Sequence, residues 1–157
     1  MVGMTMTDIP RAIHRAEEDL PFIDFGDGMQ LQLLQVDIDQ GLWVVRTRFE
    51  PGTTIPKHKH TGAVYAFTIA GRWKYLEYPE INTPGSYLFE PAGSVHTLTV
   101  PDDVEGITDV WFAIYGANLN YDANDNIDLV IDAGFIRDVY LGACEAQGLG
   151  RPDVVGA

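Results

Sequence analysis

Three of the chain's four histidines lie in two short segments whose residue types fit metal chemistry. His58 and His60 are two residues apart, so on an extended strand their imidazole rings point to the same side, and a neighbouring strand can add His96. Neutral imidazole binds iron, zinc, copper, nickel and cobalt. Three such ligands leave positions open for substrate, water or dioxygen, whereas a structural site closes its shell with a fourth protein ligand. The pattern therefore predicts an open, catalytic metal site.

The first of these segments has a second interpretation when it is taken alone. A His-Lys-His sequence also fits an exposed strand edge, with Lys57 and Lys59 on a solvated outer surface. The second segment, which runs from Gly85 to His96, decides in favour of a metal site because it supplies the third imidazole.

Short extended runs separated by turn-forming Pro, Gly and Asp residues fill the middle of the chain. The expected strands cover residues 30–37, 42–49, 63–70, 72–77, 86–90, 96–100 and 108–115. Seven or more short strands without helical patterns between them predict an antiparallel sandwich or barrel, here over about residues 21–118. On the run 42–49, Trp43 and Phe49 share one face, and Arg46 and Arg48 lie on the other.

Helical patterns are expected only at the two ends of the barrel. The segment 7–20 predicts a short N-terminal helix, with Ile13 on its apolar face. A second helix over about 132–147 has Asp132 as its cap and Gly148 after its end. The predicted fold is therefore all-β, a small antiparallel barrel with one short helix at each end.

The composition limits the classes of partner. The chain has 157 residues, 23 acidic and 10 basic side chains and a net charge of −13. Nucleic acids and anionic membranes are excluded, because phosphate binding needs clustered Lys and Arg. The one cysteine, Cys144, cannot form an internal disulfide, and neither a signal peptide nor an apolar run near 18 residues is present. We expect one cytoplasmic domain over residues 1–157.

Both histidine segments resemble the motifs of the cupin family. The first cupin motif is Gly, five residues, His-x-His, three or four residues, Glu and a later Gly; the second is Gly, five residues, Pro-x-Gly, two residues, His and a later Asn. The matching positions are Gly52, His58, His60, Gly71, Gly85, Pro91, Gly93 and His96. This resemblance implies a jelly-roll-like β-barrel with the metal inside, in agreement with the strand pattern.

Two positions depart from the family pattern. Val64 or Tyr65 stands where the first motif has its Glu ligand, and Val100 replaces the final Asn. The chain therefore resembles a narrower group, the bacterial cupin dioxygenases that cleave β-diketones and hydroxyketones. Residues 71–78 and 86–96 are similar to the 2,4′-dihydroxyacetophenone dioxygenases, and the acetylacetone dioxygenases look more distant.

The resemblance implies a reaction and its cofactor. Its metal is a mononuclear non-haem Fe(II) bound by His58, His60 and His96, with Zn, Ni, Co, Mn or Cu as alternatives. The implied reaction, part of aromatic ketone catabolism, cleaves a carbon–carbon bond of a ketone with dioxygen. From 2,4′-dihydroxyacetophenone it gives 4-hydroxybenzoate and formate. A homodimer or homotetramer is the implied assembly.

Further residues are candidates for the same site. Glu90 is expected to hydrogen-bond a ligand or take the substrate proton, and Tyr65, in the vacant Glu region, to hydrogen-bond the substrate. The candidate substrate-binding residues are Trp43, Phe67 and Trp111. Each has a plainer interpretation, a strand-end charge for Glu90 and packing for the aromatic residues. Two other functions remain open: another cupin dioxygenase with a β-diketone such as acetylacetone, or a non-catalytic metal- or ligand-binding cupin resembling those of anti-sigma factors.

Overall fold

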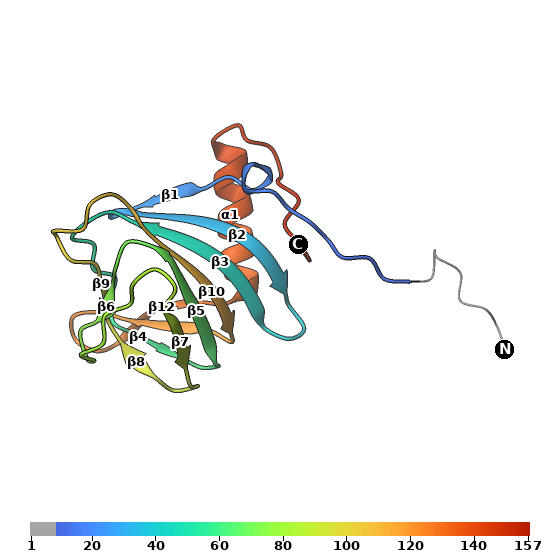
Figure 1. Cartoon of the computed structure of the whole chain (residues 1–157). Helices are drawn as coiled ribbons and strands as arrows, with labels where there is room; N and C mark the ends of the chain where they lie inside the picture. The colour runs from blue at the N-terminus through green and yellow to red at the C-terminus, as the bar shows by residue number, and fades with distance from the viewer. Residues whose placement is uncertain (1–8) are drawn as a thin grey trace.

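The computed structural model describes residues 9–157, in which two antiparallel sheets face each other and one helix packs at the side (Figure 1). The elements in chain order are η1 (Glu17–Asp19), β1 (Ile23–Gly26), β2 (Met29–Asp37), β3 (Leu42–Phe49), β4 (His58–His60), β5 (Val64–Ala70), β6 (Lys74–Tyr75), β7 (Tyr87–Glu90), β8 (Val95–His96), β9 (Leu98–Thr99), β10 (Thr108–Tyr115), β11 (Asn118–Tyr121), β12 (Ile127–Ile131) and α1 (Ala133–Ala146). The larger sheet has the order β1-β2-β3-β10-β5-β7, the smaller one β12-β11-β4-β8, and β6 pairs with β9.

The mainly β fold with antiparallel sheets and a C-terminal helix is confirmed. Strands β3 and β10 have the bounds expected from the sequence, and α1 begins after Asp132, whose side chain accepts a hydrogen bond from the Phe135 amide. The strands continue past the expected barrel limit at residue 118, because β11 and β12 form a hairpin. The polar segment between them is only a turn, closed by Asp122.

Side chains point alternately to the inner and outer faces of each strand, and the apolar ones on the inner faces form the core between the two sheets. On β3, Trp43, Val45 and Phe49 are buried on the inner face, whereas Arg46 and Arg48 lie on the outer face. The same alternation places Val110 and Phe112 of β10 inside. Burial of these apolar side chains is the main stabilising contribution to the barrel.

The predicted N-terminal helix is wrong within the described residues. Residues 9–16 form no helix, and the single 3₁₀ turn η1 follows them; Thr7 and Asp8 lie outside the described residues. A short amphipathic helix needs its apolar stripe buried, but Ile13 is 63% exposed and only Leu20 packs into the core. Residues 9–14 are exposed instead, and this stretch of the chain leads away from the barrel (Figure 1).

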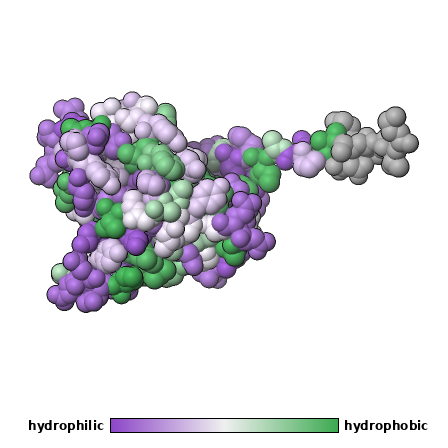
Figure 2. Space-filling view, turned by 90° about the horizontal axis from the view of Figure 1, so that it is seen from below, coloured by the Kyte–Doolittle hydropathy of each residue, from purple (hydrophilic) through white to green (hydrophobic). Residues whose placement is uncertain are grey.

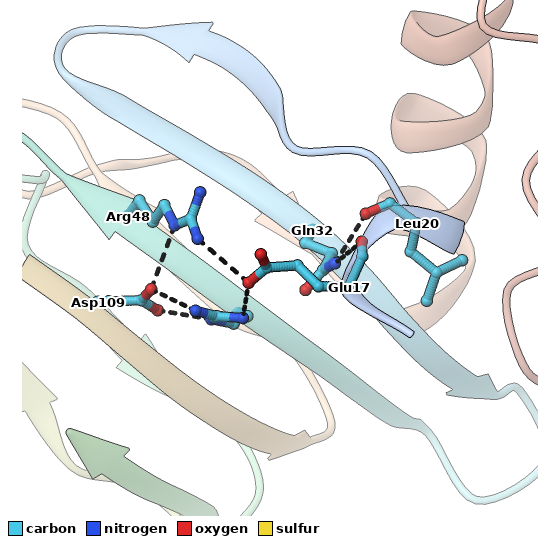
Figure 3. Close-up of polar contacts among 6 residues, drawn as sticks. Glu17, Leu20, Gln32, Arg48 and Asp109 are labelled. Carbon is cyan, nitrogen blue, oxygen red and sulfur yellow. Dashed lines mark hydrogen bonds and ion pairs between the residues drawn. The ribbon is translucent and has the colours of Figure 1, made fainter. Parts of the chain in front are cut away.

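Polar contacts hold η1 against the outer face of the larger sheet (Figure 3). The side-chain amide of Gln32 donates to the Glu17 carbonyl at 3.0 Å. Arg46 and Arg48 both donate to the Glu17 carboxylate and to Asp109 Oδ2, the latter at 2.7 and 3.1 Å. Asp109 is nearly buried, and its hydrogen bonds raise the pKa of Arg46. Two carboxylates, those of Glu17 and Asp109, thus balance the two partly buried guanidinium groups.

Replacing Asp109 with Asn should therefore destabilise the fold. The change leaves Arg46 and Arg48 short of a counter-charge, and we expect the free energy of unfolding to fall by about 2 kcal/mol. Urea denaturation measures this change. The matched control is Asp103→Asn, which breaks an exposed pair with Arg72 and should cause no measurable change. Equal effects of the two substitutions would contradict the assignment.

The surface mixes polar and apolar residues. Figure 2 shows hydrophobic side chains in several separate patches among hydrophilic ones on the underside of the molecule. Scattered patches of this kind are ordinary for a protein surface. The helix found within residues 9–157 lacks the length and apolar character needed to cross a membrane.

Candidate metal centre

Two neighbouring strands of the smaller sheet bring three histidines together. His58 and His60 are the ends of β4, and His96 lies on β8 directly opposite His58. All three side chains are buried, with ring centroids 4.8 to 4.9 Å apart. One nitrogen from each ring lies within 4.8 Å of the others. We refer to His58, His60 and His96 as the histidine cluster.

The hydrogen bonding of the cluster fits a metal ion. Both ring nitrogens of His60 and of His96 are buried without a hydrogen-bond partner, which is rare unless another ligand satisfies them. The Nδ1 atom of His58 lies 2.9 Å from the Pro56 carbonyl, to which it can only donate, so His58 Nε2 is left as the ligand atom. The cluster therefore offers three free nitrogen lone pairs.

Burial also sets the charge of the cluster. Desolvation lowers the pKa of all three rings, and for His60 and His96 the neighbouring rings add to this effect, which brings the pKa to about 3. The rings are consequently neutral at pH 7, the form in which imidazole binds metals. Buried lone pairs gathered in this way repel one another unless a cation shares them.

Glu90 lies beside two members of the cluster. Its Oε2 is 3.2 Å from His60 Nε2, and its Oε1 is 3.4 Å from His96 Nε2. Burial raises the pKa of Glu90 to about 7. Glu90 ends β7 and pairs in register with Val64 of β5, which is one of the two positions, Val64 or Tyr65, that correspond to the Glu of the cupin motif. Glu90, on the neighbouring strand β7, thus brings a carboxylate close to the place where the Glu ligand of the cupin motif would lie.

Tyr75 connects Glu90 with the cluster and was missed by the sequence reasoning. Its hydroxyl donates to Glu90 Oε1, and its ring stacks on His96 with a centroid distance of 3.7 Å and an interplanar angle of 16°. The tyrosine is 3% exposed. The sequence could have indicated Tyr75, because it lies two residues after Trp73, and residues at this spacing on a strand share one face. Both side chains are buried inside the barrel.

Two members of the cluster, His58 and His60, line one end of a cavity of about 370 Å³ between the sheets and α1, and His96 lies behind them. Tyr75 lies at this end as well, and Trp43, a candidate substrate-binding residue, lines the wall. Asn118 and Asn120 of β11 also line the cavity, where they pair in register with His60 and His58. The sequence reasoning did not select either asparagine.

Three predicted site residues do not reach the cavity. Tyr65 and Phe67 alternate with the buried Val64 and Ala66 of β5 and lie on the outer face, where Phe67 is 45% exposed. Trp111 pairs in register with Phe67 on the same outer face. None of the three lines the cavity. We correct their expected position for this reason: strand alternation turns them away from the histidine cluster.

Comparison with known proteins reveals one family over most of the chain. The sequence profile of the ChrR cupin-like domain matches residues 11–109, which include the histidine cluster. A cupin-fold protein of unknown function from Ralstonia eutropha is 36% identical, with 92% of this chain and 96% of that chain covered and a TM-score of 0.82. Among proteins with curated functional descriptions, none matches.

Two further solved structures share the fold at low identity. The acetylacetone dioxygenase of Acinetobacter johnsonii is 16% identical, with 91% of this chain and 98% of that chain covered and a TM-score of 0.73. The anti-sigma factor ChrR of Rhodobacter sphaeroides, in complex with SigE, is also 16% identical, with 64% of this chain and 51% of that chain covered and a TM-score of 0.53.

Proposed function

Because the chain belongs to the family of ChrR cupin-like domains, we propose that its histidine cluster binds one divalent metal ion and that the protein is a ketone-cleaving dioxygenase. The observation that carries this proposal is a cluster of three neutral, buried imidazoles, two of which line an apolar cavity. The proposed metal ligands are His58, His60 and His96, and Fe(II) is the proposed metal. Since all three ligands are neutral, the ion would keep its full positive charge for an anionic substrate.

The proposed substrate is a β-diketone, or another ketone with two oxygens that can bind the same ion, such as the hydroxyketone 2,4′-dihydroxyacetophenone. When bound, iron would supply a positive charge for the two oxygens and a redox-active partner for dioxygen. Similarity in fold to an acetylacetone dioxygenase supports the diketone class. The reaction consumes one dioxygen molecule per ketone, and both of its oxygen atoms enter the products.

The chain's own residues have separate tasks in this proposal. His58, His60 and His96 would hold the metal ion, and His58 and His60 line the cavity, so the ion would be within reach of the ketone oxygens. Tyr75 lines the cavity and donates to Glu90, so a proton from the ketone can pass to the Tyr75 oxygen while the hydroxyl proton moves to Glu90 Oε1. Apolar walls such as Trp43 exclude water from the reacting groups.

A panel of ketones tests the proposal. Protein loaded anaerobically with Fe(II) should consume oxygen with acetylacetone, a phenyl-substituted β-diketone or 2,4′-dihydroxyacetophenone, in a one-to-one ratio with the ketone. Zinc-loaded protein is the matched control, because zinc fits the same ligands but has no redox chemistry. A protein that binds one metal ion per chain but cleaves no ketone would instead be a non-catalytic metal-binding cupin.

A further inference from the structure

The cavity has two chemically different ends. Polar side chains gather at the histidine cluster, where Tyr75, Asn118 and Asn120 join His58 and His60. The remaining wall is almost entirely apolar, and no Lys, Arg, Asp or Glu is among its lining residues. A charged group placed there would lose its hydration without gaining a partner. The far end therefore fits only an uncharged, apolar part of a ligand.

One wall of this far end comes from the first half of α1. Phe135, Ile136 and Val139 line the cavity at the spacing that places side chains on one helical face. The second half of the helix is fixed to the barrel, since Tyr140 and Cys144 are fully buried and the Tyr140 hydroxyl donates to the Pro21 carbonyl at 2.6 Å. A fixed helix can act as a size limit for whatever occupies the cavity.

This wall also lies outside the segment that the family shares. The family profile ends at residue 109, whereas the histidine cluster lies within it and α1 follows it. Hairpin β11–β12 adds Leu129 and Ile131 to the same wall. The histidine cluster and apolar lining residues such as Trp43 and Leu98 thus lie in the segment that the profile matches, whereas α1 and the hairpin add a wall from outside it.

We propose that Phe135, Ile136 and Val139 determine substrate specificity by holding the uncharged, apolar substituent of the ketone whose oxygens face the histidine cluster. The inference rests on the proposed function. It excludes ketones with a carboxylate or phosphate on the substituent. The cavity volume is at the lower end of the range for small-molecule sites, which leaves room for a substituent as large as a single aromatic ring.

Equilibrium binding of three β-diketones tests the proposal without turnover. Dissociation constants are measured under argon from the absorption change of Fe(II)-loaded full chain with acetylacetone, its phenyl analogue and the 4-carboxyphenyl analogue. The phenyl analogue should bind about tenfold more tightly than acetylacetone, because its ring is buried against apolar walls. The 4-carboxyphenyl analogue should lose at least this tenfold gain in affinity, because its carboxylate would be buried without a partner. Equal affinities would overturn the inference.

Substitutions in α1 test whether the preference for the phenyl analogue depends on this wall of the cavity. Val139→Trp should weaken binding of the phenyl analogue about tenfold and leave acetylacetone within about twofold, because the indole fills the far end only. The matched control is Val130→Trp on β12, where Val130 is exposed and does not line the cavity. Should Val139→Trp not fold, Phe135→Ala provides the opposite test, since a shorter side chain should admit a naphthyl analogue that the wild type rejects.

The outcomes separate the inference from the proposed function. Binding of all three diketones with unchanged preference in Val139→Trp overturns the role of α1 and leaves the proposed function standing. If the metal-loaded wild type binds none of them, the proposed function and the inference both fail.

Discussion

Replacing His96 with Gln should weaken metal binding strongly and cost the metal-free fold only the packing of the imidazole ring on Tyr75. In the wild type, both His96 nitrogens are buried without a hydrogen-bond partner. The substitution therefore breaks no hydrogen bond within the protein. Loss of one ligand of three should reduce metal affinity at least about 100-fold. The metal content of purified protein measures the effect, and His60→Gln should behave in the same way.

Thermal unfolding separates a metal ligand from a packing residue. A ligand present at 1,000 times its dissociation constant stabilises the folded state by about 4 kcal/mol, which raises the melting temperature of a chain of this length by about 10 °C. We expect this rise with added metal in the wild type and in the control His14→Gln, where His14 is exposed outside the cluster. The rise should be absent in His96→Gln. An equal rise in all three proteins would contradict the assignment of His96.

Replacing Glu90 with Gln should slow turnover about 100-fold or more while the metal content stays intact. The amide keeps the size of the side chain but cannot accept the proton that Tyr75 passes on. Steady-state oxygen uptake measures the effect, with metal content determined on the same samples. Tyr75→Phe removes the hydroxyl that links the cavity to Glu90 and should reduce turnover similarly.

A control substitution and the metal content distinguish a proton-accepting Glu90 from a metal ligand and from a residue with no part in the chemistry. Glu80→Gln changes an exposed carboxylate and should leave turnover unchanged. If Glu90→Gln loses the metal, Glu90 is a fourth ligand, a role that its distances of 3.2 and 3.4 Å to the His60 and His96 nitrogens would also allow. Unchanged turnover would remove Glu90 from the chemistry.

The histidine cluster was predictable from the sequence because strand geometry alone aligns it. The two-residue period turns His58 and His60 to one side, and the register of β4 with β8 adds His96. The same alternation would have excluded Tyr65, Phe67 and Trp111 if the inner face of their strands had been known. The sequence did not show which face was the inner one, because aromatic residues occur on both faces of these strands.

Other parts depended on contacts between segments far apart in the chain. Helix α1 was expected, but nothing local indicated that Phe135 and Val139 would line the same cavity as the histidine cluster. The N-terminal segment had a helical pattern, but residues 9–14 are exposed and form no helix, and the chain meets the sheet at η1, where Glu17 contacts Arg46. Local propensity is a weak prior when tertiary contacts compete with it.

Oxygen uptake with labelled dioxygen tests the central claim most directly. The iron-loaded chain is given a β-diketone under isotopically labelled dioxygen, and the mass of the carboxylic acid product is measured. The account predicts one labelled oxygen atom in that acid and one dioxygen consumed per ketone. An unlabelled acid, or an intact ketone beside protein that carries one iron per chain, would contradict it.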